Sequence, residues 1–302
     1  MADAARLRIA AKRGRAAPSD GAKAPSIGLV LGGGGARGLA HILMLEVFDE
    51  LGLKPKIIAG TSIGAIYGAA YAAGLSARDI RAHTEDVLTK RFGLVRDLFA
   101  ARVQAGLRNL FAARSALLAP ATLLDLVLPK DVPQSFEDLA IPLRVVASDF
   151  YALEAAVFAE GPLRPAVAAS IALPVIFEPV LIEGRSLIDG GLTNPLPFDL
   201  IAGEADVLVA VDVSGTTVPS PSRPRPTAIE ALFASSFLFE RSIVREKLKA
   251  HRPDIYVDAG MGRFQALEFL KVREILAAAE PAKAALREKL ERVIASPLGT
   301  EG

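Results

Sequence analysis

The 302-residue chain has no cysteine and only three histidines. Without cysteine, disulfide bonds, thiolate nucleophiles and cysteine-ligated zinc sites are excluded. With so few histidines, the chain offers few imidazole groups for general-base catalysis, the task that histidine most often performs in enzymes. The sequence also lacks any uninterrupted run of about 18 or more apolar residues, so we expect no membrane-spanning helix.

The sequence also has no large excess of positive or negative charge. The 35 lysines and arginines nearly balance the 34 aspartates and glutamates, which gives a formal net charge of +1. We therefore expect neither a nucleic-acid partner nor a strongly acidic one. Apolar side chains are abundant, at 51% of residues, and can form a sizeable buried core. We expect a cytoplasmic protein, and a peripheral position at a membrane stays open.

Basic residues concentrate at the N-terminus, where residues 1–25 carry six lysines and arginines against two aspartates. This segment has no sustained apolar stretch of the kind found in secretory signals, so we predict a disordered basic tail. Residues 26–215 are predicted to form the main part of one domain, with a helical insertion at about 76–140. Residues 216–302 are predicted to add helices and a strand to the same domain, because no break in composition separates them.

Short apolar runs alternate with helical patterns along the chain. The run "IGLVL" at 27–31 predicts a buried strand and is followed by a helical pattern at 38–51. A second strand, "KIIAG" at 56–60, precedes a helix of small residues that ends at Gly74. Further strands are predicted at 143–150, 155–161, 187–191, 205–215 and 254–258, and further helices at 164–174, 227–250 and 264–290. This order predicts an α/β fold with a mostly parallel central sheet.

A basic amphipathic pattern lies in the predicted insertion, at about 97–120. Phe99, Val103 and Leu107 share one helical face, and several arginines lie elsewhere on the helix. Such a helix can pack against the core or lie at a lipid interface. The sequence leaves both interpretations open.

The segment "LGGGGARGLA" at 31–40 first suggests a nucleotide site. Residues 33–38 satisfy the G-x-G-x-x-G pattern between a strand and a helix, which is the setting of a dinucleotide-binding loop. That mechanism also requires an acid at the end of the second strand to bind the ribose, and the chain has Gly60-Thr61-Ser62 there. A phosphate-binding P-loop is excluded because no Gly-Lys-Ser/Thr follows the glycines. A dinucleotide-dependent oxidoreductase is therefore the weaker alternative.

The second strand instead runs into "GTSIG" at 60–64, a G-x-S-x-G pattern between a strand and a helix. This is the setting of a nucleophile elbow, in which a tight turn presents a serine hydroxyl at the start of a helix. Gly60 and Gly64 provide the small residues that such a turn needs on either side of Ser62. The pattern predicts that Ser62 is a catalytic nucleophile.

A serine nucleophile needs a base, and the base is usually a histidine. His41, His83 and His251 all lie within or beside predicted helices, so each is interpreted as a structural or solvated residue. Asp189 is the best candidate, because it ends an apolar strand and is followed by Gly190 and Gly191. A carboxylate has a reference pKa of roughly 3.9, so burial would have to raise the pKa of Asp189 for efficient proton transfer.

Asp149 and Asp212 are the competing acids, since each also ends a predicted strand. Neither is flanked by glycines, so both rank below Asp189. Attack by a serine on an ester creates an oxyanion, and the ends of neighbouring parallel strands lie side by side. The backbone N–H groups of Gly33, Gly34 and Gly35 are therefore the candidate donors of hydrogen bonds to that oxyanion.

The motifs "GGGGARG", "GTSIG" and "DGG", in that order, resemble those of the patatin-like phospholipase family. "AASIALPVIFEPV" at 168–180 is similar to the Ser-x-Ala-Leu/Ile-Pro…Phe-x-Pro segment of the family, and "LIDGGLTNPLP" at 187–197 to its Asp-Gly-Gly/Ala…Asn-x-Pro segment. The resemblance covers about residues 27–215. It implies a three-layer α/β/α patatin-like fold and lipid acyl hydrolysis by a Ser-Asp dyad, with neither a metal nor a cofactor.

Carried onto this chain, the resemblance makes Ser62 the nucleophile and Asp189 the proton acceptor. It makes residues 33–38 the oxyanion-binding loop, in which Arg37 takes the basic position of the family and Gly38 ends the motif. The extra glycine at 32 leaves the register of the donors open, and the chain has Asp-Gly-Gly where Asp-Gly-Ala is common. We therefore expect a lipid ester as substrate. A lipid-binding or regulatory protein with a silent dyad remains an alternative, and the oligomeric state is not predicted.

Overall fold

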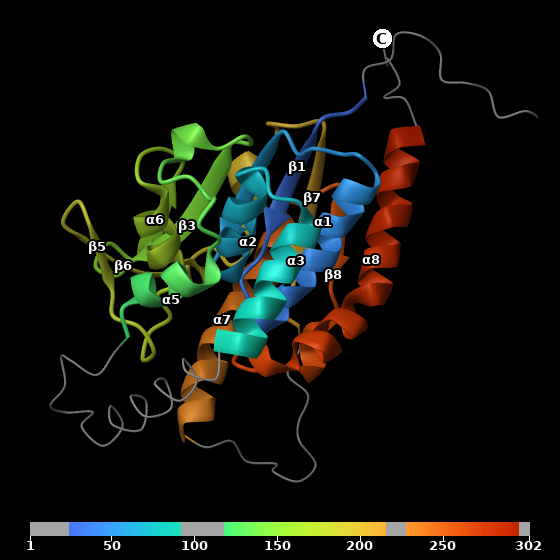
Figure 1. Cartoon of the computed structure of the whole chain (residues 1–302). Coiled ribbons are helices and arrows are strands. Elements are labelled where there is room, and N and C mark those ends of the chain that lie inside the picture. The colour runs from blue at the N-terminus through green and yellow to red at the C-terminus, as the bar shows by residue number, and fades with distance from the viewer. Residues whose placement is uncertain (1–23, 92–117, 216–227, 296–302) are drawn as a thin grey trace, which may run out of the picture.

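The computed structural model describes residues 24–91, 118–215 and 228–295 (Figure 1). These residues form an eight-stranded sheet with helices on both of its faces. The strands are β1 Ile27–Leu31, β2 Ile57–Thr61, β3 Leu143–Asp149, β4 Glu154–Phe158, β5 Val180–Ile182, β6 Arg185–Asp189, β7 Val207–Asp212 and β8 Ile255–Asp258. The helices are α1 His41–Glu50, α2 Ile63–Ala72, α3 Ala77–Asp86, α5 Pro120–Val127, α6 Leu163–Ser170, α7 Ala228–Ala250 and α8 Val272–Ala295.

The sheet is parallel in its larger part. Strands β3, β2, β1, β7 and β8 lie side by side in that order and run parallel. Strands β4 and β6 pair antiparallel with β3, and β5 pairs antiparallel with β6 at the edge of the sheet. The predicted α/β fold with a mostly parallel sheet is confirmed, and the antiparallel strands on one side of it are an addition that the sequence pattern did not reveal.

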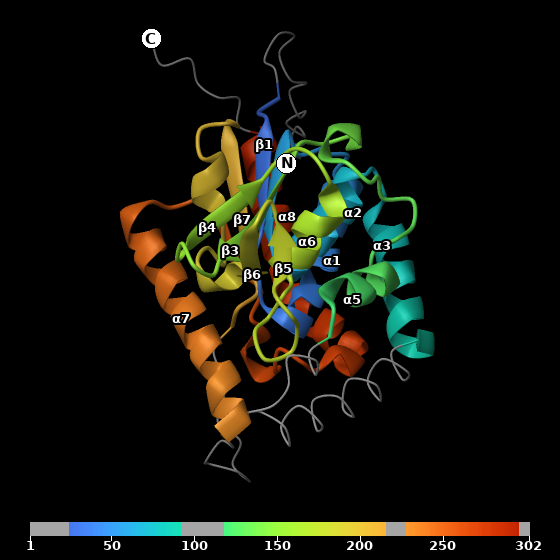
Figure 2. The ribbon, with the colours of Figure 1, turned by 90° about the vertical axis from the view of Figure 1, so that its left-hand side faces the viewer.

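The central strand β1 is buried on both faces, as its continuous apolar run predicts. Ile27, Leu29 and Leu31 belong to the larger core, which includes residues of α1, α2 and α8. Val30 points to the opposite face, where the core includes Val244 of α7. Figure 2 shows α7 on one side of the sheet and α1, α2 and α6 on the other, so the layers are arranged as α/β/α.

Strand β3 brings the ends of two strands together. On one edge β3 pairs with β4 along Val145–Asp149, so β2 and β6 must share the other edge. There Thr61, the last residue of β2, pairs with Val146, while Asp189, the last residue of β6, pairs with Ala147. Because β2 and β6 run in opposite directions along β3, their carboxyl ends meet. This topology places the residue after Thr61 beside Asp189.

Several boundaries differ from the predictions. The helix predicted at 38–51 is divided into a 3-10 turn at Gly35–Ala40 and α1, because the glycine-rich loop turns tightly into the helix. The helix predicted at 264–290 begins only at Val272, after two short 3-10 turns. The predicted N-terminal tail, except for its last residues, and most of the amphipathic pattern at about 97–120 lie outside the described residues. The predicted domain division stays a prediction.

Candidate active site

Ser62 lies in the tight turn between β2 and α2, with backbone angles of φ 54° and ψ −123°. A positive φ is rare for a residue with a side chain and marks a strained turn of the nucleophile-elbow type. Only small residues fit around it. A Cβ atom on Gly60 would lie 2.6 Å from the carbonyl oxygen of Gly64, and one on Gly64 would lie 2.1 Å from that of Leu31. The glycines let α2 start directly against the ends of β1 and β2.

The hydroxyl of Ser62 donates a hydrogen bond to the carboxylate of Asp189, with 2.7 Å between Oγ and Oδ2. Asp189 is only 5% exposed and is fixed by three further bonds. Its N–H donates to the carbonyl of Ala172, its carbonyl accepts from Ser148 Oγ, and its Oδ1 accepts from the N–H of Gly191. The structure therefore brings the predicted nucleophile and the predicted base into direct contact, with the base held rigidly.

Burial raises the pKa of Asp189 to about 6. Loss of water around the carboxyl group is the main cause, and the hydrogen bonds from Gly191 and Ser62 act in the opposite direction by stabilising the charged form. Asp189 is therefore a stronger base than an exposed aspartate and is still mostly ionised at neutral pH. A raised pKa of this kind is what efficient proton transfer from Ser62 to an aspartate requires.

Ser170, the last residue of α6, holds the turn in place. Its Oγ accepts a hydrogen bond from the N–H of Ser62 at 2.8 Å and donates one to the carbonyl of Val146 at 2.5 Å. The side chain is completely buried. We assigned no role to Ser170 from the sequence, although it is the serine of the Ser-x-Ala-Leu-Pro segment at 170–174. That segment was the only sign in the sequence that Ser170 has a role. Its contact with Ser62 could not be predicted without the tertiary structure.

The glycine loop lies beside Ser62, where a Cβ atom on Gly33 would come within 3.5 Å of Ser62 Cβ. The N–H of Gly33 already donates to the carbonyl of Pro195 at 2.9 Å. Of the three candidate donors, Gly33 is therefore already engaged by a backbone acceptor. Within the part of the chain that the structure describes, the N–H groups of Gly34 and Gly35 have no backbone acceptor. Ile63, at the start of α2, has an N–H without an intrahelical partner as well.

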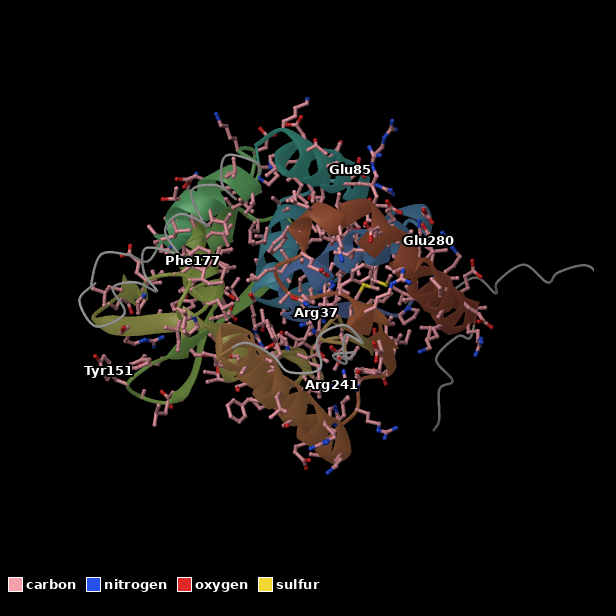
Figure 3. The ribbon with its side chains drawn as sticks, turned by 90° about the horizontal axis from the view of Figure 1, so that it is seen from below. Arg37, Glu85, Tyr151, Phe177, Arg241 and Glu280 are labelled. Carbon is pink, nitrogen blue, oxygen red and sulfur yellow. The ribbon has the colours of Figure 1, made fainter. Side chains whose placement is uncertain are left out.

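Arg37 belongs to the glycine loop and is 5% exposed. Its guanidinium lies over the ring of Phe237 at 4.8 Å, and burial lowers its pKa, while the charge of Glu240 acts in the opposite direction. Its Nε has no hydrogen-bond partner among the described residues. Figure 3 shows Arg37 near the middle of the molecule.

Gly38, the last residue of the glycine loop, must lack a side chain, since a Cβ atom there would lie 2.2 Å from the side chain of Ile63.

The competing acids are engaged elsewhere. Asp149 accepts hydrogen bonds from the N–H groups of the turn that follows β3. Asp212 accepts hydrogen bonds from Ser214 and from Tyr256. Neither of them contacts Ser62, so the ranking of Asp189 above both agrees with the geometry.

The three histidines likewise have other contacts. His41 is fully buried under the glycine loop, its Nε2 lies 2.9 Å from the carbonyl oxygen of Gly32, and burial lowers its pKa to about 4. His83 contacts the carbonyl of Val127, and His251 stacks on Phe198. None of the three is hydrogen-bonded to Ser62. Among the described residues, no three His, Asp or Glu side chains are grouped so that they could hold a metal ion.

A cavity of about 390 Å³ opens at the Ser62–Asp189 pair. Its walls are mainly apolar and come from α2, α5, α7 and the segments around 171–177 and 266–269. Phe177, labelled in Figure 3, is one of these wall residues. This volume is within the usual range for a small-molecule pocket, and Ser62 and Asp189 are among the few polar residues of its mainly apolar lining.

The family model of patatin-like phospholipases matches residues 29–202, which include Ser62, Asp189 and the glycine loop. The chain belongs to the patatin-like phospholipase family. This confirms the resemblance seen in the motifs.

Related proteins differ in length from this one. An uncharacterised NTE family protein of Mycobacterium tuberculosis is 36% identical over 235 residues, which cover 76% of this chain and 61% of the relative. Patatin-like phospholipase domain-containing protein 7 of Rattus norvegicus is 32% identical over 62% of this chain and 14% of its own length. The neuropathy target esterase of Drosophila melanogaster is 35% identical over 62% of this chain and 13% of its own length. The chain thus spans less than two thirds of these relatives.

Among solved structures, VipD from Legionella pneumophila superimposes with a TM-score of 0.48 at 13% sequence identity, covering 88% of this chain and 67% of that one. Separately, no helix among the described residues is both long and apolar enough to span a membrane.

Proposed function

We propose that this patatin-like protein is a serine acyl hydrolase that acts on phospholipids or related lipid esters through an acyl-Ser62 intermediate. The observation that carries the proposal is the hydrogen bond from Ser62 Oγ to the buried carboxylate of Asp189 at the end of an apolar cavity. A nucleophile in contact with its base, next to a space for an apolar chain, fits the hydrolysis of an ester with a long acyl group.

In the first step Asp189 accepts the proton of Ser62 Oγ while Oγ forms a bond to the ester carbonyl carbon. The tetrahedral intermediate then expels the alcohol, which takes the proton from Asp189 as the carbon–oxygen bond of the ester breaks. In the second half, water attacks the acyl carbon and gives a proton to Asp189. That proton returns to Ser62 Oγ as the fatty acid leaves, so the protein ends unchanged.

The oxyanion of each tetrahedral intermediate is proposed to accept hydrogen bonds from the N–H groups of Gly34 and Gly35. These two groups lie in the loop beside Ser62 and have no backbone acceptor in the described part of the chain. Ile63 supplies a further candidate donor from the start of α2. Donors that point at the developing charge stabilise the transition state by roughly 3–4 kcal/mol each when they are well aligned.

A peripheral contact with a lipid surface is part of the proposal. Leu238 and Phe239 on α7 are 63% and 59% exposed, next to Phe237 in the cavity wall. Leu267 and Leu270 are 45% and 54% exposed, on either side of the wall residue Phe269. Groups of large exposed apolar side chains are typical of surfaces that contact a protein or a membrane, and we propose that these side chains contact lipid.

A panel of esters tests the substrate class. We expect kcat/KM to increase with acyl length, because each methylene that the cavity buries contributes about 0.8 kcal/mol. Phospholipids in mixed micelles and soluble p-nitrophenyl esters of matched acyl length should be measured side by side, together with labelling by a fluorophosphonate. Binding of lipid vesicles without turnover or labelling would instead identify a lipid-binding protein with a silent dyad.

The pH dependence tests the role of Asp189 as a base. Since only the ionised carboxylate can take the proton, kcat/KM should increase as pH rises through the pKa of about 6. The measurement is kcat/KM for a soluble ester from about pH 4.5 to about pH 7.5, with stability at each pH checked by circular dichroism. A profile that is flat across this range would contradict the role of Asp189.

A further inference from the structure

Glu240 is a second carboxyl group in the same cavity. It lies on α7 one helical turn after Phe237, and both side chains line the cavity that contains Ser62 and Asp189. Glu240 is 3% exposed, although its neighbour Phe239 is 59% exposed. A charged residue type is almost never this deeply buried without a specific reason. Figure 3 shows the helix α7, on which Arg241 is labelled, passing across the molecule next to Arg37.

The two carboxyl groups converge on Gly191. A Cβ atom placed on this glycine would lie 2.9 Å from Glu240 Oε1 and 3.1 Å from Asp189 Oδ1. Any side chain at this position would therefore collide with both groups. The absence of a side chain at Gly191 is what allows Glu240 to approach the base of the site so closely.

The hydrogen bonds around the two carboxyl groups are unequal. Asp189 accepts from Ser62 and from Gly191, and both bonds favour its ionised form. No side chain or backbone group of the described residues donates a hydrogen bond to Glu240. When two neighbouring buried carboxyls share one proton, the group with fewer donors keeps it. The proton therefore stays on Glu240, and the charge stays on Asp189.

Burial is the largest cause that raises the pKa of Glu240, to about 8. Three charged groups from three elements also act on it: Asp189 at the end of β6 raises this pKa, Arg37 in the glycine loop lowers it, and Asp212 at the end of β7 raises it. Arg241, the next residue on α7, lies 3.6 Å from Asp212 and pairs with that acid. Glu240 is neutral at neutral pH and ionises in mildly alkaline solution.

We propose that Glu240 is a positioning residue that acts through Asp189: while neutral it leaves Asp189 as the charged carboxyl, and once ionised it makes Asp189 a stronger base. During attack by Ser62, the negative charge leaves Asp189 and appears on the substrate oxygen. Repulsion between Glu240 and Asp189 is relieved by that transfer, so ionised Glu240 favours it. This inference rests on the proposed function, because it assumes that Asp189 receives the proton of Ser62.

The test is the pH profile of the rate constant for labelling of Ser62 by a fluorophosphonate, from about pH 5 to about pH 9.5. The full chain should show two rises, one near pH 6 and a second, of about 3- to 10-fold, near pH 8. Glu240→Gln keeps the shape of the side chain and remains neutral. It should retain the first rise and lose the second.

Glu246→Gln is the matched control, because Glu246 lies on the same helix and its side chain is 60% exposed. This variant should keep both rises. A second rise that persists in Glu240→Gln, or a profile without it in the unaltered chain, would overturn the inference while labelling itself still supported the proposed function. Absence of labelling at every pH would instead contradict the proposed function.

A second measurement does not depend on turnover. Infrared difference spectra between about pH 7 and about pH 9.5 should show the loss of a protonated carboxyl band in the unaltered chain. The same band should be missing from Glu240→Gln and present in Glu246→Gln. An unaltered chain without this band would show that Glu240 is already ionised at neutral pH and would overturn the inference.

Discussion

Ser62→Ala is expected to lower ester hydrolysis by about 10⁴-fold or more and to abolish fluorophosphonate labelling. The reason is that no other group would form the bond to the acyl carbon, since the hydroxyl that contacts Asp189 is the one removed. Residual activity above the uncatalysed rate would come from the donors of the glycine loop alone. Labelling should be read by mass spectrometry of the intact chain, and hydrolysis by release of p-nitrophenol.

The fold of Ser62→Ala should be unchanged. The turn is anchored by the N–H of Ser62, which donates to Ser170, and alanine keeps that bond. Ser235→Ala is a matched control, because Ser235 is exposed on α7 and bonds only to the carbonyl of Ala231 among the described residues. Its variant should label and hydrolyse normally. Fluorophosphonate labelling that persists in Ser62→Ala would show that Ser62 is not the nucleophile.

Asp189→Asn is expected to lower kcat/KM by about 10²- to 10⁴-fold, the usual contribution of a general base. Asparagine is close to aspartate in shape, but its side chain ends in one oxygen and one NH₂ group where aspartate has two oxygens. Its carbonyl must face the N–H of Gly191, as Asp189 Oδ1 does, so its amide nitrogen would face Ser62. An amide donates to the hydroxyl and cannot take a proton from it. Near-normal turnover would contradict the role of Asp189 and point to another base, with His41 or another acid to be tested next.

The same variant should be more stable than the unaltered chain above about pH 6. Folding raises the pKa of Asp189 from 3.8 to about 6, so the folded chain binds the proton more tightly than the unfolded chain. Below about pH 3.8 Asp189 is protonated in both the folded and the unfolded chain, so its ionisation does not affect stability. As pH rises from about 3.8 to about 6, the free energy of unfolding falls. Above about pH 6 the buried charge lowers it by about 3 kcal/mol, and asparagine, which carries no charge, avoids this loss. Urea unfolding of both chains at about pH 4 and about pH 7.5 checks this.

A rise in stability together with a loss of turnover would indicate that the aspartate is present for chemistry and not for folding. This pairing separates the expected result from simple misfolding, in which activity and stability fall together. If Asp189→Asn were less stable than the unaltered chain at about pH 7.5, the carboxylate would be a structural group in a favourable environment, and its role as a tuned base would be contradicted.

The local parts of the structure were predictable from sequence. Apolar runs gave the strands of the sheet, and the G-x-S-x-G pattern placed Ser62 in a turn between a strand and a helix, where the structure has it. The motifs also indicated the family, which the family model confirms. These features depend on residues close to one another in the chain, so burial periodicity and turn chemistry were enough.

The hydrogen-bond partners of individual backbone groups could not be predicted from the sequence. Three consecutive glycines look equivalent as donors, yet the N–H of Gly33 is taken by the carbonyl of Pro195, more than 160 positions away. Ser170 and Glu240 were missed for the same reason. A single acid at the end of the apolar stretch "LFASSFLFE" at 232–240 was a signal of burial, but nothing local showed which group it would approach.

The sequence by itself determined the sheet-forming runs, the nucleophile turn, the glycine loop and the choice of aspartate as the candidate base. Only the tertiary structure decided that Asp189 lies at hydrogen-bond distance from Ser62, 127 positions earlier. That contact arises because β6 runs antiparallel to β3 and ends against the end of β2. The burial that raises the pKa of Asp189 and the approach of Glu240 follow from the same packing, since both depend on helices and strands that are distant in the chain.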